Sequence, residues 1–98
     1  QPHLYTRTRD FYQEFADSLS LLDEVILTDI YPARELPIDG VSSLLIYDSL
    51  RPEVKKTICK KEDILNLLQE KDIEVLMTLG AGDIDNYVPL ITDLLNQR

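Results

Sequence analysis

The sequence has few of the residues that build disulfides and metal sites. Its 98 residues contain one cysteine, Cys59, and one histidine, His3. A single cysteine cannot form a disulfide within the chain, and such low usage is typical of proteins from a reducing compartment. A zinc site of the usual Cys/His type needs more ligands of these two kinds and is excluded within this chain.

Long apolar runs and excess positive charge are also missing. No run approaches the roughly 18 apolar residues that a membrane span needs, and the N-terminus has no apolar signal-peptide core. Lys and Arg total 10 against 18 Asp and Glu, a formal charge of −8. Because neutralising phosphates requires a cationic face, this balance argues against a domain that binds nucleic acid or an anionic membrane.

The size and composition are typical of one folded domain. Hydrophobic residues make up 44% and charged residues 29% of the chain, so disorder is not expected. A chain of this length can bury one modest core but has no room for a second domain. Since it opens on Gln-Pro-His rather than Met, we expect it to be part of a longer protein.

Apolar periodicity alternates between helical and strand spacing. We expect helices over 10–22, 42–50, 61–70 and from 83 onward, and strands over 25–30, 54–59 and 73–79. The first strand is apolar enough to be covered on both faces, as in a parallel sheet. Thr8 or Asp10 is expected to cap the first helix and Asp83 the last. Pro89 should kink that last helix or mark its first turn.

This order of elements predicts an α/β fold with a mostly parallel, three-layer, Rossmann-like sheet flanked by helices. Three strands make a thin sheet, so we expect more sheet on the N-terminal side, ending just before residues 1–3. Ligands of open parallel sheets bind beyond the carboxyl ends of the strands. Residues 1–9, 31–40 and 80–83 are predicted to share that edge.

The first of these segments is a cationic island in an acidic chain. His3, Arg7 and Arg9 precede the first acid, Asp10, and Thr6 lies between them. Arg7 offers a planar fork for a carboxylate or phosphate, His3 adds a donor, and a helix N-terminus adds backbone N–H groups. Arg9 is expected to pair with nearby acids. The spacing alone favours an anion site and a set of solvated side chains equally.

Gly80-Ala81-Gly82 is the second candidate, because glycine lets the backbone turn sharply and approach a ligand. The third glycine of a dinucleotide fingerprint is missing and no P-loop is present, so a plain strand-to-helix turn is the simpler interpretation. The basic residues between 51 and 61 flank a short strand and a helix start with no aromatic residue among them, so a structural role is preferred to nucleic-acid binding. No motif indicates a catalytic or metal-binding residue.

The opening decapeptide resembles a known motif. Residues 1–10, Gln-Pro-His-Leu-Tyr-Thr-Arg-Thr-Arg-Asp, are similar to Gln-Pro-His-Arg-Tyr-Thr-Arg-Thr-Arg-Asp in the C-terminal domain of Mur ligases, enzymes of bacterial peptidoglycan synthesis. Residues 29–31, 35–41 and 80–82 resemble a strand end, a Glu-x-Pro-Ile-x-Gly-Val loop and the final turn of that family. Leu4 replaces an arginine of the family, and residues 32–34 also depart from it.

The resemblance implies an ATP-dependent, three-domain ligase of the bacterial cytoplasm, with residues 1–98 as part of its C-terminal domain. In such a ligase ATP phosphorylates the carboxylate of UDP-N-acetylmuramate, and the amine of L-alanine attacks the acyl phosphate. The central domain carries the P-loop and the magnesium ligands, and the N-terminal domain holds the UDP group. Both lie outside this chain, so we expect the fragment alone to be inactive.

The resemblance also implies roles for particular residues when the domains close. The C-terminal domain helps to bind nucleotide and amino acid, with His3 and Arg7 at the alanine carboxylate. The other substrate-binding residues that we predict are Thr6, Gly80, Ala81 and Gly82. A second hypothesis is a non-catalytic, flavodoxin-like module that binds a small anion or a partner protein. Such a module should bind strongly by itself, whereas a ligase fragment should not, because a domain interface completes its site.

Overall fold

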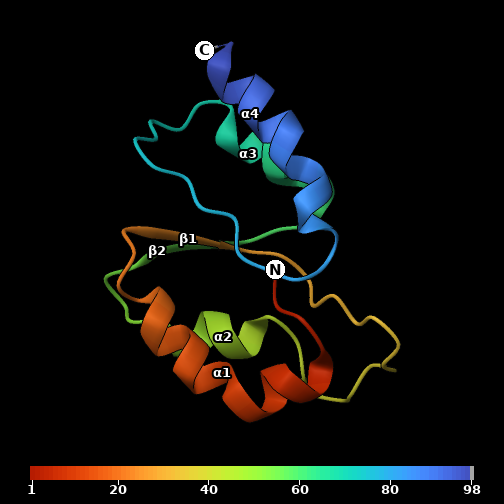
Figure 1. Cartoon of the computed structure of the whole chain (residues 1–98). Helices are drawn as coiled ribbons and strands as arrows, with labels where there is room; N and C mark the ends of the chain where they lie inside the picture. The colour runs from red at the N-terminus through yellow and green to blue at the C-terminus, as the bar shows by residue number, and fades with distance from the viewer. Residues whose placement is uncertain (98) are drawn as a thin grey trace.

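The architecture is described from a computed structural model that defines residues 1–97. A two-stranded parallel sheet lies between two groups of helices (Figure 1). The elements in chain order are α1 (Tyr5–Leu19), β1 (Glu24–Leu27), α2 (Leu44–Ser49), β2 (Lys55–Ile58), η1 (Lys61–Asp63), α3 (Ile64–Leu68), η2 (Asp83–Tyr87) and α4 (Val88–Asn96). No helix within the described residues has the length and apolar character needed to cross a membrane.

The two strands and α2 form a βαβ unit. Glu24 lies opposite Lys55 and Leu27 lies opposite Ile58 in parallel register. Parallel strands cannot be joined by a tight hairpin, and the segment containing α2 supplies the crossover. Helices α1 and α2 pack together on one face of the sheet. The core on that face consists of Ala16, Val25, Leu27, Ile46, Leu50 and Val54.

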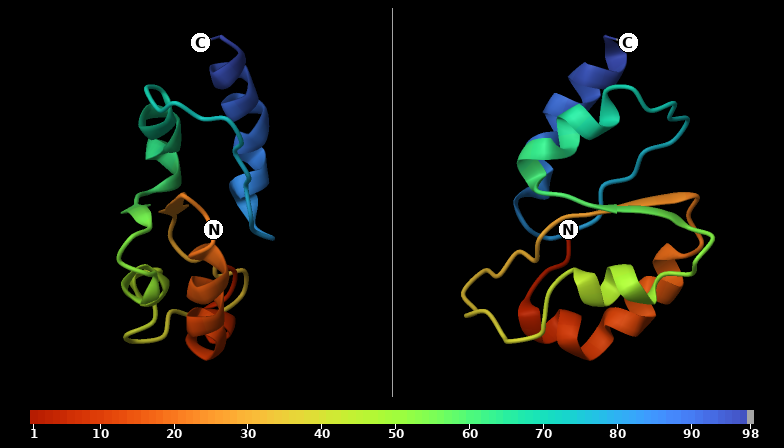
Figure 2. Two further views of the ribbon diagram at one scale, coloured as in Figure 1. Left: turned by 90° about the vertical axis from the view of Figure 1, so that its left-hand side faces the viewer. Right: turned by 180° about the vertical axis from the view of Figure 1, so that it is seen from behind.

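A second core lies on the other face of the sheet, against α3 and α4. It consists of Ile64, Leu68, Ile84 and Ile91. Successive strand side chains point to opposite faces, and in β1 Val25 and Leu27 belong to the first core while Ile26 packs against the second. The two further views show helices on both sides of the strands (Figure 2). The prediction that the first strand is covered on both faces is therefore confirmed.

The predicted α/β class is confirmed, but the three-layer Rossmann-like sheet is not. Residues 73–79, the predicted third strand, form no strand within the described part of the chain. Val75 and Met77 are 81% and 60% exposed. A strand persists only where a neighbour takes up its backbone hydrogen bonds. No backbone hydrogen bond joins residues 73–78 to the rest of residues 1–97.

The helix starts also differ from the prediction. Thr8 and Asp10 lie inside α1, so neither caps it. Asp83 lies at the start of η2 and makes no cap there. Pro89 lies in the first turn of α4, where backbone N–H groups have no partner within the helix, so a proline costs no hydrogen bond. This position confirms one of its two predicted roles.

Candidate functional site

The three segments predicted to share a sheet edge do meet there. Tyr31, which follows β1, donates from its backbone N–H to the Pro2 carbonyl at 2.8 Å and accepts from the Leu4 N–H at 2.9 Å. On the other side, the Gln1 nitrogen donates to the Leu79 carbonyl at 2.9 Å. The N-terminal segment therefore lies between the loop after β1 and the glycine turn, as strand polarity predicted.

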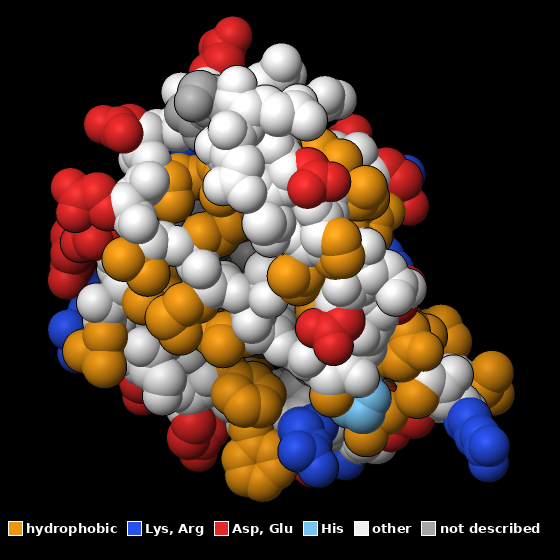
Figure 3. All heavy atoms as spheres, turned by 45° about the horizontal axis from the view of Figure 1, so that its top comes forward, with side chains coloured by type: hydrophobic (Ala, Val, Ile, Leu, Met, Phe, Trp, Pro, Cys, Tyr) orange, Lys and Arg blue, Asp and Glu red, His pale blue; other side chains and the backbone are white. Residues whose placement is uncertain are grey.

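The ring of Tyr31 contacts both the N-terminal segment and the glycine turn. The His3 imidazole stacks on it, with centroids 5.8 Å apart and planes inclined by 15°. A Cβ on Gly82 would lie 2.5 Å from Tyr31 Cγ, so the ring and the turn are in close contact. The histidine is half-buried and reaches the surface of the molecule (Figure 3). Tyr31 was not among the predicted site residues, although it lies in the segment 31–40 that was expected at this edge, and it forms an isolated parallel bridge with His3.

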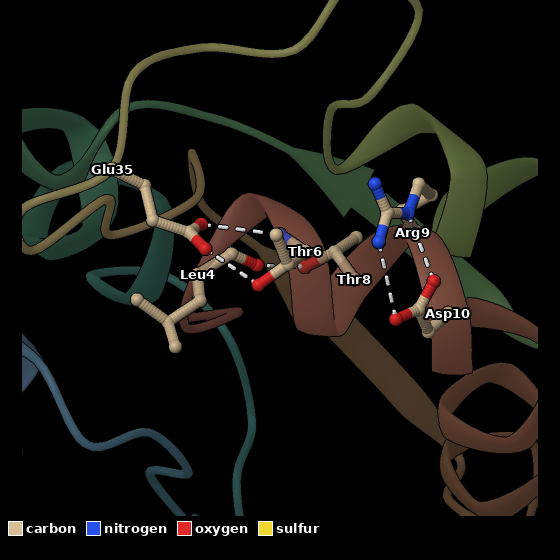
Figure 4. A network of polar contacts seen from close by, with 6 residues as sticks. All are labelled: Leu4, Thr6, Thr8, Arg9, Asp10 and Glu35. Carbon is tan, nitrogen blue, oxygen red and sulfur yellow. Dashed lines mark hydrogen bonds and ion pairs between the residues drawn. The ribbon is translucent and has the colours of Figure 1, made fainter.

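The two arginines of the cationic island differ in their partners. Arg9 Nε donates to Asp10 Oδ1 at 2.8 Å (Figure 4), which confirms its predicted pairing and raises the pKa of Arg9. Arg7 is exposed, and its side chain makes no hydrogen bond or ion pair with any other residue of the described range. The Arg7 guanidinium therefore keeps all its donors available for a carboxylate or phosphate.

Thr6 is engaged by a carboxylate of the protein itself. Glu35 accepts hydrogen bonds from the Thr6 N–H at 3.1 Å and from the Thr6 hydroxyl at 2.5 Å (Figure 4). The hydroxyl bond is the main cause that lowers the pKa of Glu35. A negative charge at a helix N-terminus also suits the helix dipole. Glu35 thus caps α1 from the loop after β1, a role that local sequence spacing did not indicate.

A polar network fixes the glycine turn to the N-terminal segment. Gln1 Nε2 donates to Asp83 Oδ1 at 2.7 Å, and Gln1 Oε1 accepts from the Ile84 N–H at 3.0 Å. Lys61 forms an ion pair with the other Asp83 oxygen, so this member of the basic cluster has a structural role within the protein. The bond from Lys61, followed by that from Gln1, lowers the pKa of Asp83.

An apolar hollow of about 80 Å³ lies between β1 and residues 76–79. Ile26 and Thr28 line one side, and Leu76 and Leu79 line another. Hydrophobic side chains surround a depression in the space-filling view (Figure 3). The Thr28 hydroxyl oxygen is buried and makes no hydrogen bond within residues 1–97. The hollow therefore combines apolar walls with a buried hydroxyl oxygen that makes no hydrogen bond among the described residues.

The edge offers binding groups rather than a reactive pair. Arg7 is exposed, His3 is half-buried against Tyr31, and Gly80 and Ala81 are exposed. No group of three His, Cys, Asp or Glu side chains suited to hold a metal ion occurs among the described residues. These exposed and half-buried groups are donors that suit a small anion.

Comparison with known proteins identifies relatives along the whole chain. A UDP-N-acetylmuramate–L-alanine ligase of Phocaeicola vulgatus is 76% identical over 98 residues, which are 100% of this chain and 21% of that protein. Proteins of the same name from Parabacteroides distasonis and Cytophaga hutchinsonii are 56% and 50% identical, over 97% and 100% of this chain and 20% and 21% of their own lengths. No family model matches the chain. The chain spans about a fifth of the length of these curated relatives.

Proposed function

We propose, from the premise that the chain is a segment of the UDP-N-acetylmuramate–L-alanine ligase family, that it forms part of the domain that closes over the amino-acid substrate. The observation that carries the proposal is the sheet edge at which the N-terminal segment, Tyr31 and the glycine turn meet. The names of the relatives favour this hypothesis over the non-catalytic anion-binding module. We place the whole reaction in the bacterial cytoplasm, where ATP is available.

The proposed chemistry divides between this edge and the remainder of the longer protein. The muramate carboxylate takes the γ-phosphoryl group of ATP and ADP leaves. The alanine amine then attacks the acyl phosphate, and an amide forms as phosphate and the amine proton leave. Arg7 and His3 hold the alanine carboxylate, which orients the amine toward the acyl carbon. Closure of the domains excludes water, which would otherwise hydrolyse the acyl phosphate. Magnesium ligation and most nucleotide contacts are assigned to the central domain.

Thr6 and the glycine turn have different parts in this proposal. The donors of Thr6 are taken by Glu35, so Thr6 supports the site by fixing the start of α1. Gly80, Ala81 and Gly82 present exposed or half-exposed backbone beside the N-terminal segment, where it can approach a substrate closely.

We also propose that the complete domain contains a further strand, which supports the predicted Rossmann-like sheet. The strand would occupy the hollow between β1 and residues 76–79, pair with both, and run directly into Gln1. Three observations support this placement: the apolar walls of the hollow, the unpartnered Thr28 hydroxyl, and the hydrogen bonds of the N-terminal segment to Tyr31 on one side and Leu79 on the other.

Replacement of the free arginine in the full-length ligase tests the proposed function. Arg7→Ala should raise the KM for L-alanine about tenfold or more, because a bond between charged groups contributes roughly 1.5–3 kcal/mol. The KM for UDP-N-acetylmuramate should not change. Arg9→Ala is the matched control, since its guanidinium is paired with Asp10. An unchanged alanine KM in Arg7→Ala would contradict the role given to this residue.

A further inference from the structure

The side chain of Gln1 connects the two parts of the candidate site. Its Nε2 reaches the Asp83 carboxylate at 2.7 Å and its Oε1 receives the Ile84 N–H at 3.0 Å. A carboxamide has a donor and an acceptor on one carbon and can make both bonds at once. Glutamate would lack the donor, and asparagine would be one methylene shorter.

Gln1 also determines how closely the glycine turn packs. A Cβ on Gly80 would lie 2.9 Å from the Gln1 carbonyl oxygen, and a Cβ on Gly82 would lie 2.7 Å from Gln1 Oε1. Gly80 has φ +152°, a conformation that glycine adopts readily and other residues avoid. The turn therefore passes directly against Gln1, two residues before the His3 ring.

The partner of the Gln1 amide is itself held in place. Asp83 is bound from its other oxygen by Lys61, whose side chain is 24% exposed. The backbone of the N-terminal segment is fixed independently, because Pro2 and Leu4 exchange hydrogen bonds with Tyr31. Gln1 is thus the link between two positions that are each anchored by other residues.

We propose that Gln1 is a positioning residue for the alanine site, whose carboxamide holds the Gly80–Gly82 turn against the segment that carries His3 and Arg7. The inference rests on the proposed function, because the site that Gln1 organises is the one assigned to the alanine carboxylate. Gln1 acts through the backbone of the turn and not through contact with substrate.

The test uses the full-length ligase, numbered as in this chain, with Gln1→Glu. The new carboxylate loses the donor to Asp83 and repels it, so the turn should move away from the N-terminal segment. The KM for L-alanine should rise about tenfold, the loss expected for one charge-assisted hydrogen bond, with kcat and the KM for UDP-N-acetylmuramate unchanged. The increase should shrink as the pH falls, because the introduced carboxyl group can again donate to Asp83 once it is protonated.

Gln13→Glu is the matched control. Gln13 lies exposed on α1 and donates to Asp17 at 3.1 Å, so the same substitution creates the same repulsion away from the site and should leave the alanine KM unchanged. If Gln1→Glu does not fold, Gln1→Asn tests the proposal in its place. Asparagine keeps an uncharged amide that is too short to make both bonds.

The outcomes separate this inference from the proposed function. A raised alanine KM in a Gln1 variant with a near-normal melting temperature supports positioning. A lower melting temperature or kcat with an unchanged alanine KM overturns it and leaves Gln1 a purely structural residue. If Arg7→Ala raises the alanine KM while the Gln1 variants do not, only the inference about Gln1 fails. If Arg7→Ala has no effect, the proposed function fails.

Discussion

Two apolar runs with similar residues behave differently in this molecule. Residues 25–27 belong to β1, and Val25 is 5% exposed. Residues 73–79 contain Ile, Val, Leu and Met as well, yet they form no strand, and Val75 is 81% exposed. The first run has β2 beside it and helices on both faces. The second run faces a hollow. Apolar content gives a segment the capacity to form a strand, and a neighbouring strand decides whether it does.

The difference between the two runs should disappear in a longer protein that contains the proposed further strand. In the full-length protein, the backbone amides of residues 75–78 should exchange hydrogen roughly 100-fold or more slowly than in the 98-residue chain, because the proposed further strand would take up their hydrogen bonds. Amide exchange measured by mass spectrometry gives the result. The amides of residues 25–27 are the internal control and should be protected in both proteins. Equally fast exchange at 75–78 in both would contradict the proposed strand.

A matched pair of valine substitutions compares the buried and the exposed run by their effect on the free energy of unfolding. In the 98-residue chain, Val25→Ala should cost about 2 kcal/mol, because it removes two buried methyl groups and leaves a cavity. Val75→Ala should change stability by less than about 0.5 kcal/mol, as expected for an exposed side chain. Urea denaturation monitored by circular dichroism measures both. Equal costs for the two substitutions would show that residues 73–79 are buried in solution.

The sequence allowed the local elements to be predicted, because their signals lie within a few residues. Apolar spacing indicated both strands of the observed sheet and the helices around them, and Pro89 marked the first turn of α4. Strand polarity also predicted that three distant segments meet at one edge. The resemblance to Mur ligases came from residues 1–10 and agrees with the relatives.

The remaining features depend on contacts that no local pattern contains. Glu35 caps α1 from 29 positions away, so Thr8 and Asp10 were wrongly expected to do so. Asp83 binds Lys61 and Gln1 across 22 and 82 positions, and this competes with capping its own helix. The third predicted strand is not formed, because no other strand within residues 1–97 takes up the backbone hydrogen bonds of residues 73–78.

The smallest expected effect concerns the hydrogen bonds by which Glu35 caps α1. Like a strand, the start of this helix depends on a partner that is distant in sequence. Hydrogen bonds from Thr6 lower the pKa of Glu35 from its ordinary value of 4.5. A lowered pKa in the folded state means that the ionised carboxylate stabilises the fold above pH 4.5, and that this stabilisation is lost as the pH falls below that value. Glu35→Gln should therefore reduce the acid-dependent part of the unfolding free energy, measured by urea denaturation at neutral pH and below pH 4.5. Glu14→Gln, an exposed position on the same helix, is the control. If both variants keep the full acid dependence of the parent chain, Glu35 does not stabilise α1 through its charge.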